Sequence, residues 1–362
     1  IIKIMAPHFN FMLASARSCP YPVFVTKQAA VAMNTNFRGF VRALWRPLSG
    51  TAAATFCGTG AAGCAAALRL GPGQQRACGG HWRRCGRGGR GACMDRLGDT
   101  GAAIERLERH ALAERIPGLR SKWTGAVWEP ACADIDVAGL HAHYLQHAKT
   151  RGVDLRTRAR IAQVEREDGV WTLASESGEQ FRAATLVNAA GAWADRLAEA
   201  AGIRPLGIQP LRRTVVQLRV DPAPPSDMPL VLDISGRFYF KPEAGRVWLS
   251  PHDEEPSEAC DAAPEELAVA EAIDRLQGVV DWRVEAVERR WAGLRSFAPD
   301  RRPVYGYDPR VEGFAWFAGQ GGFGIQTAPA AVRLASQLLL GLERDAMTRS
   351  LDASLYAPEL SR

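Results

Sequence analysis

Glycines at the spacing G-x-G-x-x-G form the first pattern in this chain that can do chemistry. The stretch TFCGTGAAGCAAALRL contains them as Gly58, Gly60 and Gly63. Glycines at this spacing allow a tight turn, a close approach of the backbone to a pyrophosphate, and close packing of the next helix on the sheet. The residues TAAATF before them favour a short buried strand, and CAAALRL after them favours a helix. The pattern therefore indicates a dinucleotide-binding turn.

The residues that follow this turn lack the acidic anchor of a dinucleotide site. In such sites a second strand ends in Asp or Glu about 20 residues further on and holds the ribose hydroxyls. Residues 71–94 contain neither a strand pattern nor a carboxylate. The sequence thus contains only half of the expected site.

Two later segments also have small residues where a strand leads into a helix. TLVNAAGAWADRLA reaches Ala190 and Gly191, and FAGQGGFGIQTAPAA covers residues 317–331. Small residues at such turns let a flat cofactor lie against the backbone. Each segment alone also fits an ordinary turn between packed elements, but three such turns in one chain favour a cofactor domain.

The motifs VNAAGAWAD, WAGLRSFAPDRRPVYGY and QGGFGIQTAPAA resemble those of the FAD-dependent oxidoreductases of the D-amino-acid oxidase type, which include glycine oxidase and sarcosine oxidase. LGIQPLRRT, FYFKPEAG and WAGLRSF are most similar to the D-arginine dehydrogenase branch of that family. The resemblance runs from about residue 105 to residue 345. It implies oxidation of an amino acid at its α-carbon, with FAD accepting the hydride and the imino acid hydrolysing in water.

The resemblance also implies which residues lie against the cofactor. These are Gly58, Gly60, Gly63, Ile161, Ala190, Gly191, Trp193, Gly321, Phe323, Gly324, Ile325, Gln326 and Thr327. The family also has a Ser/Thr-Gly-Arg-Ser stretch beside the flavin, and residues 71–113 contain no match to it. A flavin-free, inactive relative of the family is therefore an alternative.

Four residues are candidates for the catalytic site by the same resemblance. Arg295 resembles the arginine that grips the substrate carboxylate, since a guanidinium fork matches a carboxylate bidentately; a surface salt bridge is its alternative. Arg213 resembles a second substrate arginine, and Arg212 beside it would point to the other side of a strand. Tyr239 resembles the tyrosine that closes over the carboxylate, with core packing as its alternative. Gly322 would lie near the flavin and the substrate amine.

The substrate class follows from the branch resemblance alone. An acidic pocket would select D-arginine or D-lysine. The family has roughly 90 residues between its first glycine motif and the region that matches ERIPGLR, whereas this chain has about forty, and the family residue that supplies the acidic group should lie in the missing part. Sarcosine, glycine and 2-hydroxy acids stay open as substrates. Oxygen and a quinone both stay open as electron acceptors.

The predicted fold class is α/β, with a FAD-binding Rossmann-like domain from discontinuous segments and an inserted antiparallel-sheet substrate domain. We assign residues 51–100, 150–205 and 296–345 to the FAD-binding domain. Residues 101–149 and 206–295 form the substrate domain, in which GAAIERLERHALAERIPGL (residues 101–119) is expected to be helical. Residues 1–50 are an unassigned basic segment.

Charge divides the chain sharply. Residues 1–94 contain twelve Lys or Arg and no Asp or Glu, whereas the rest holds 33 basic residues and all 39 acidic ones. The basic stretch could be a targeting segment, a nucleic-acid-binding arm at residues 76–90, or a stretch that is not a selected coding sequence. An aromatic-rich basic surface is missing elsewhere in the sequence, so we expect no nucleic-acid partner.

The composition, 47% hydrophobic and 23% charged, is that of a globular protein. No stretch approaches the roughly 20 unbroken apolar residues of a membrane span. After residue 94 only Cys132 and Cys260 occur and no C-x-x-C pair is present, which favours a reducing, cytoplasmic compartment and no zinc site. His143 and His147 have i, i+4 spacing, but solvated helix positions are favoured over metal ligands.

Overall fold

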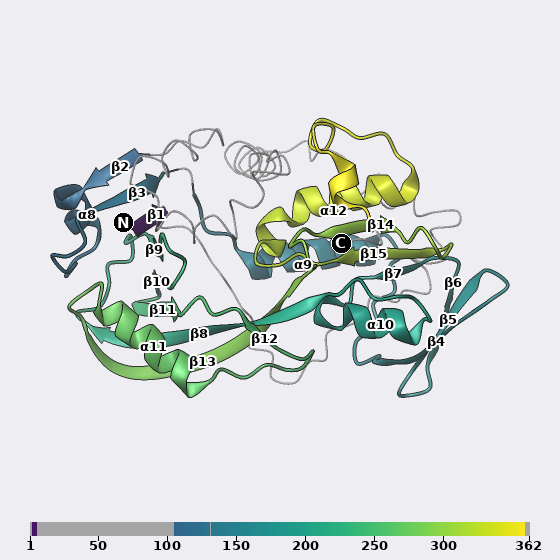
Figure 1. The fold of residues 1–362 in the computed structure, drawn as a ribbon, viewed down its shortest axis with the longest axis horizontal. Helices are drawn as coiled ribbons and strands as arrows, with labels where there is room; N and C mark the ends of the chain where they lie inside the picture. The colour runs from purple at the N-terminus through teal and green to yellow at the C-terminus, as the bar shows by residue number, and fades with distance from the viewer. Residues whose placement is uncertain (1, 6–104, 131, 359–362) are drawn as a thin grey trace.

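The computed structural model describes residues 2–5, 105–130 and 132–358 (Figure 1). The predicted glycine turn of Gly58, Gly60 and Gly63 lies outside these residues. Everything stated below about the structure refers to the described residues.

Among the described residues, the largest sheet has nine strands in the order β12-β8-β11-β10-β9-β1-β3-β2, with β13 paired to the other side of β8. Every pairing in it is antiparallel except that of β1 with β3. The strands are β1 (Ile2–Met5), β2 (Glu105–Glu108), β3 (Gly125–Glu129), β8 (Gln209–Asp221), β9 (Leu230–Asp233), β10 (Tyr239–Glu243), β11 (Arg246–Ser250), β12 (Glu255–Pro256) and β13 (Arg283–Phe297).

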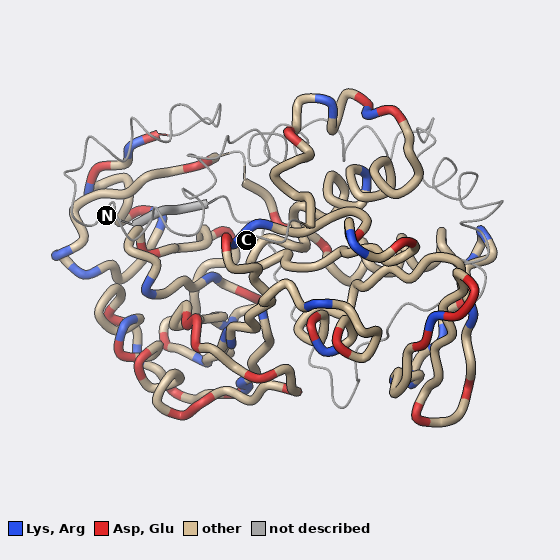
Figure 2. The backbone as a smooth tube through the Cα atoms, turned by 45° about the vertical axis from the view of Figure 1, so that its right-hand side comes forward, with Lys and Arg blue, Asp and Glu red and all other residues tan. Residues whose placement is uncertain are grey.

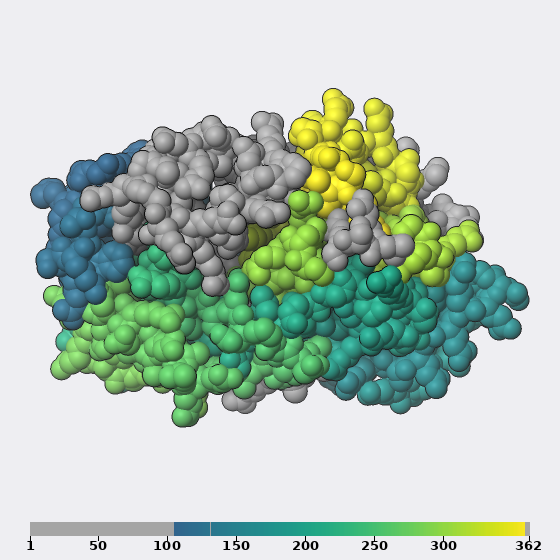
Figure 3. Space-filling view, in the orientation of Figure 1, coloured from purple at the N-terminus to yellow at the C-terminus, as the bar shows by residue number. Residues whose placement is uncertain are grey.

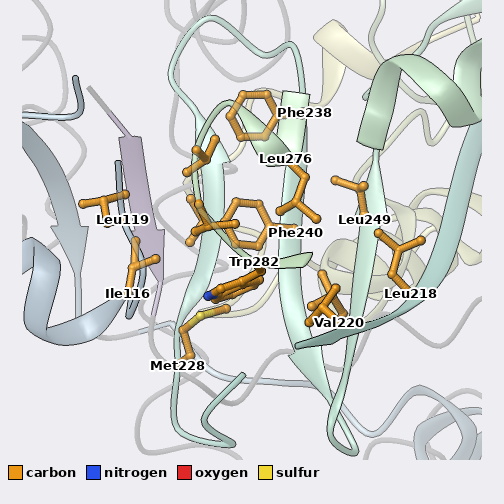
Figure 4. Close-up of a cluster of buried hydrophobic side chains, with 14 of the residues drawn as sticks. Ile116, Leu119, Leu218, Val220, Met228, Phe238, Phe240, Leu249, Leu276 and Trp282 are labelled. Carbon is orange, nitrogen blue, oxygen red and sulfur yellow. The ribbon is translucent and has the colours of Figure 1, made fainter. Parts of the chain in front are cut away.

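One face of this sheet is apolar because alternate residues of its strands are hydrophobic. Helix α11 (Glu266–Gln277) packs on that face and buries Val269, Ala272 and Leu276. Helix α8 (Arg109–Arg115) contributes Leu112 to the same core. Figure 4 shows the core, where strand residues such as Phe240 face Trp282 and Leu276. Burial of each large apolar side chain contributes about 1.5–3 kcal/mol, so this face holds the sheet in place and leaves the opposite face for function.

Two smaller sheets accompany a second core. In one, β7 (Leu186–Asn188) is parallel to β15 (Phe314–Ala318), which is antiparallel to β14 (Val304–Tyr307). The other is a meander of β4 (Ile161–Glu167), β5 (Val170–Ser175) and β6 (Gln180–Ala183). The other helices of the described residues are α9 (Val137–Thr150), η1 (Gly191–Trp193), α10 (Ala194–Ala200), α12 (Gly324–Leu340) and η2 (Ala353–Tyr356).

The predicted α/β class is confirmed, with one local correction. Residues 105–108 were expected to be helical but form the edge strand β2, and the helix α8 begins only at Arg109. Leu107 reaches the core by pairing antiparallel with β3, and this burial outweighs the helix propensity of the segment. Residues 2–5, which had no predicted assignment, form β1 between β9 and β3. The domain boundaries given above stay a prediction.

Candidate active site

Strand register brings three of the predicted residues to the polar face of the large sheet. Arg213 on β8 lies opposite Gly293 on β13, so both point to the same side, and Arg295 two residues further points there too. Tyr239 on β10 lies opposite Ser250 on β11. Leu249, the neighbour of Ser250, is opposite Val216 and belongs to the apolar core. Because neighbouring strand residues point to opposite sides, Ser250 and Tyr239 lie on the other face of the sheet, the face of Arg213.

Arg213 is the most constrained of these three side chains. It is only 1% exposed, and its Nη2 donates to Glu254 Oε1 at 3.3 Å. Its Nε and Nη1 are buried and have no hydrogen-bond partner in the described part of the chain. Burial and, next, the nearby charge of Arg295 together lower the pKa of Arg213 to about 10, against opposing contributions from Tyr239, Glu254 and Asp253. The site therefore holds a desolvated cation that needs an anion.

The guanidinium of Arg295 lies against the glycine turn that precedes α12. A Cβ added to Gly322 would lie 2.6 Å from Arg295 Nη1, and one added to Gly321 would lie 2.5 Å from the ring of Phe297. Gly321 also has φ +57, and its N–H donates to the carbonyl of Ser296 at 2.8 Å. Glycine at these positions lets the turn pack directly on the end of β13.

Tyr239 has an aromatic environment and an unsatisfied hydroxyl. Its ring contacts His252 edge-on, with centroids 5.7 Å apart, and His252 Nδ1 lies 2.8 Å from the carbonyl oxygen of Gly236. The Tyr239 hydroxyl is buried and lacks a hydrogen-bond partner among the described residues. A buried hydroxyl ordinarily has a partner, so a ligand on this face would supply it.

Glu254 connects Arg213 to the end of β13. Arg301 Nη2 donates to both oxygens of Glu254, at 3.0 and 3.1 Å. The guanidinium carbon of Arg301 lies 3.9 Å from the centre of the Phe297 ring. Arg213 is therefore oriented by Glu254, which is held by Arg301, and Arg301 lies on the Phe297 ring against which Gly321 also packs.

Arg212 has a different role from its neighbour. It ion-pairs with Glu265, at 2.5 Å, and with Asp253, at 3.8 Å. Both partners lie away from the face that carries Arg213, as the strand alternation predicts.

The turn after β7 contains three of the residues expected to contact the cofactor. Buried Asn188 holds this turn, because its Nδ2 donates to the carbonyl of Ala194 at 2.7 Å and its Oδ1 accepts from the N–H of Ala190. Gly191 has φ +59, and a Cβ there would meet no described atom within 4 Å. Together with Trp193 in η1, these residues leave open backbone at the end of a buried strand, which suits a flat cofactor.

The other expected cofactor residues open helix α12. Phe323 is its N-cap, and Gly324, Ile325 and Gln326 form its first turn. Thr327 Oγ1 donates to the carbonyl of Phe323 at 2.8 Å. The N–H groups of the first turn have no acceptors within the helix, so they can bind electron-rich ligand atoms. In Figure 3 the C-terminal part of the chain, in yellow, lies above the teal part.

Ile161 lies apart from the other predicted residues. It begins β4, is half-buried, and packs against the core of the smaller sheets. The predicted residues that are described thus fall into a group of catalytic candidates around Arg213, two glycine turns, and this separate position. Gly58, Gly60 and Gly63 are not described.

Two tryptophans of the same polar face were missed by the motif search. Trp291 is opposite Val215 and Trp248 is opposite Gln217, so both lie on the side of Arg213. Their rings meet edge-on with centroids 5.4 Å apart. In a strand over WAGLR, Trp291 and Arg295 are four residues apart and point to the same face, so the sequence already indicated that Trp291 lies on the face of Arg295.

Metal binding has no support in the described residues. They contain no group of three or more His, Cys, Asp or Glu side chains arranged for a metal ion. The rings of His143 and His147 are 4.4 Å apart on α9, a helix with no buried residue. Figure 2 shows basic and acidic residues interspersed along the described backbone, and residues 76–90 lie outside it. No described helix is long and apolar enough to cross a membrane.

Comparison with known proteins gives one family match. The model of the DAO family, described as "FAD dependent oxidoreductase", matches residues 73–338. The bifunctional protein ThiO/ThiG of Synechocystis sp. is 26% identical over 238 residues, which are 65% of this chain and 35% of that protein. The chain spans about a third to about half of the length of the curated relatives it matches.

Solved structures share the fold. Glycine oxidase from Geobacillus kaustophilus aligns with a TM-score of 0.61 and 21% identity, covering 74% of this chain and 71% of that one. L-proline dehydrogenase from P. horikoshii aligns with a TM-score of 0.62 and 21% identity, covering 73% and 70%. At this identity the likeness concerns the fold alone.

Proposed function

Because the chain belongs to the DAO family of FAD dependent oxidoreductases, we propose that it oxidises an amino acid to the imino acid, which water then hydrolyses to the 2-oxo acid and ammonia. One observation supports this most directly. Three buried polar atoms lack partners among the described residues on the face of Arg295, namely Arg213 Nε, Arg213 Nη1 and the Tyr239 hydroxyl. A substrate carboxylate would satisfy all of them.

The chain's own residues would bind and orient the substrate. Arg213 and Arg295 neutralise its carboxylate, and Tyr239 donates a hydrogen bond to it. Glu254 and Arg301 hold Arg213 in place, so the Arg213 side chain loses little conformational entropy when the substrate binds. Fixing the carboxylate orients the hydrogen on the α-carbon. Gly322, whose missing side chain makes room for the Arg295 guanidinium, is proposed to lie near the substrate amine.

FAD, when bound, supplies the acceptor for the hydride that leaves the α-carbon while the amine loses a proton. The residues that fit it are the open backbone at Ala190 and Gly191 and the first turn of α12. Gly321 and Gly322 let that turn lie close to Arg295. Gly58, Gly60, Gly63 and Ile161 remain proposed contacts to its dinucleotide portion.

A D-amino acid is the proposed substrate, and D-arginine is the first to test because of the branch resemblance. The described residues near Arg213 that carry carboxylates are already engaged, as Glu254 is with Arg213 and Arg301. An acidic partner for a guanidinium side chain would therefore have to come from another part of the chain. Glycine and sarcosine need no such partner and belong in the same panel.

We also propose that the reaction takes place in the cytoplasm. Cys260 is an exposed free thiol, as expected in a reducing compartment. The electron acceptor is proposed to be oxygen or a quinone, and a comparison of aerobic turnover with turnover in the presence of a soluble quinone distinguishes the two.

The test is to purify the chain, record its visible absorbance with and without added FAD, and add D-amino acids under anaerobic conditions. We expect bound flavin that bleaches with a substrate and releases the 2-oxo acid and ammonia. Saturating FAD, at about 100 times its dissociation constant, should raise the free energy of unfolding by about 2.7 kcal/mol. A chain that takes up no FAD would instead be the flavin-free relative.

A further inference from the structure

The polar face of the large sheet carries more unsatisfied donors than a single carboxylate needs. Trp248 Nε1 and Trp291 Nε1 are buried and have no hydrogen-bond partner among the described residues. An indole nitrogen is a donor only, as are the two unpartnered nitrogens of Arg213. The unpartnered groups of this face are therefore almost all hydrogen-bond donors, and a ligand that satisfies them has to supply acceptors.

These donors form one continuous wall, which we call the donor wall: Arg213, Tyr239, Trp248 and Trp291. Trp291 lies two residues from Gly293, the residue opposite Arg213, and its ring contacts that of Trp248. At about 3.3 Å per strand residue, Trp291, opposite Val215, lies about 7 Å along the strand from Arg213, and Trp248, opposite Gln217, lies about 13 Å from it.

Leaving such donors unpaired is costly. Each buried N–H without an acceptor destabilises the fold, and most buried polar groups in proteins are satisfied. Three other described tryptophans follow that rule: Trp123, Trp171 and Trp282 each donate their indole N–H to a backbone carbonyl. Trp248 and Trp291 depart from it on the same face as Arg213, which suggests that a ligand completes them.

The charges beside the wall do not supply an acceptor for these indoles. Lys241 is nearly buried, with Nζ 5.7 Å from the centre of the Trp248 ring. It binds the carboxylates of Asp134, at 3.4 Å, and Glu243, at 2.9 Å. Those two carboxylates are therefore engaged with a cation of their own.

We propose that Trp248 and Trp291 form the side-chain subsite and bind an oxygen acceptor of the substrate, a carboxamide or a carboxylate. This inference rests on the proposed function, because Arg213, Arg295 and Tyr239 must hold the α-carboxylate. The spacing of about 7 Å between Arg213 and Trp291, the nearer of the two indoles, suits a side chain with two methylene groups, as in D-glutamine and D-glutamate. A guanidinium carries donors only and would face donors. This subsite therefore predicts that D-arginine, which the branch resemblance puts first in the tests, is a poorer substrate than D-glutamine or D-glutamate.

The experiment measures anaerobic flavin reduction by D-glutamine, D-glutamate, D-norleucine and D-arginine with the FAD-loaded protein. We expect D-glutamine or D-glutamate to have an apparent second-order rate constant for flavin reduction about tenfold or more above that of D-norleucine. A faster reaction with D-glutamine shows that the subsite binds a neutral carboxamide, and a faster reaction with D-glutamate shows that it binds a carboxylate. Both outcomes support the subsite.

Variants assign the preference to the indoles. Trp248→Phe with Trp291→Phe keeps aromatic rings and removes both N–H groups, so the rate constant for D-glutamine or D-glutamate should fall to about that for D-norleucine measured with the same variant. Trp123→Phe removes a partnered N–H outside the wall and should leave the preference unchanged. Titration calorimetry with 2-oxoglutarate and 2-oxohexanoate gives the same comparison without turnover.

Failure of the subsite is distinguishable from failure of the proposed function. If flavin is bleached by D-norleucine or D-arginine at least as well as by the acceptor-bearing substrates, the inference is wrong and the oxidase activity stands. A preference that survives in the double variant also overturns it. If no amino acid bleaches bound flavin, the proposed function is wrong, and the subsite falls with it.

Discussion

Arg213 is a charged side chain that the fold keeps almost entirely from water. Its pKa is lowered to about 10 because burial, and then the charge of Arg295, disfavour the protonated form. The guanidinium is still protonated at neutral pH, so the folded protein carries its desolvation cost there. The single contact with Glu254 does not cancel that cost, since two guanidinium nitrogens lack partners among the described residues. Such a cost is typical of residues kept for binding.

Replacing this cation should therefore stabilise the protein and weaken substrate binding. Arg213→Met should raise the free energy of unfolding by about 1–4 kcal/mol, because Glu254 keeps its pair with Arg301. The same change should raise the KM for an amino acid about tenfold or more. Urea unfolding at pH 7 and steady-state kinetics measure the two effects. A less stable variant with unchanged KM would show that Arg213 is a structural cation.

At the scale of elements, β13 connects the large sheet to the cofactor turn. It carries Trp291, Gly293 and Arg295 on one face at alternate positions and ends at Phe297. The ring of Phe297 lies under Gly321, in the turn that opens α12. The position of Arg295 and the shape of the turn are consequently coupled through this contact, the bond from the Gly321 N–H to Ser296, and the close approach of Gly322 to Arg295.

Two glycines of the α12 region separate backbone strain from this contact. Gly321 and Gly341 have nearly equal φ, +57 and +59, but only Gly321 lacks space for a Cβ, since Gly341 has no described atom within 4 Å. Gly341→Ala should cost about 1–2 kcal/mol for the left-handed conformation. Gly321→Ala should cost more, by about 1–3 kcal/mol, for overpacking against Phe297.

Thermal unfolding of both variants, with FAD content measured in parallel, checks this prediction. Gly321→Ala should also reduce bound FAD, whereas Gly341→Ala should retain it. Equal losses of stability and equal FAD content in the two variants would show that the turn does not depend on its packing against β13.

At the scale of the whole molecule, acid stability should depend on the C-terminal part. The pKa values of Asp308 and Asp345 lie below the ordinary value for Asp. Burial alone would raise the pKa of Asp308, but hydrogen bonds from Arg310 and Trp316 outweigh it. A carboxylate with a lowered pKa in the folded state stabilises the protein above its unfolded pKa near 3.8, and this stabilisation is lost as pH falls through the lower folded value.

Asp308→Asn should show this dependence. At pH 7 the variant should lose about 2–3 kcal/mol, because Arg310 and the Trp316 indole lose a buried anion. Below pH 4 the difference from the wild type should narrow, since the wild-type carboxylate is then becoming protonated. Urea unfolding at pH 7 and pH 3 measures it, with Asp352→Asn as an exposed control that should change little. A constant difference at both pH values would contradict the assignment.

Local patterns in the sequence were sufficient for several elements and for the family. The motif around Arg295 and the glycine turn at 319–324 are each a continuous stretch of sequence. Each can therefore be identified from its own residues, without knowledge of distant parts of the chain. Strand alternation was enough to separate Arg213 from Arg212. The same local logic failed at β2, where residues of good helix propensity form an edge strand because Leu107 is buried against the large sheet.

From the sequence alone came the family resemblance, the α/β class and the identity of three substrate-binding candidates. Only the tertiary structure decided that Arg213, Arg295 and Tyr239 share a face, that Glu254 orients Arg213, and that Trp248 and Trp291 complete a donor wall. These relations join residues of four strands that are far apart in the chain. Strand register and burial set them, and whether a buried donor has a partner depends on every atom packed around it.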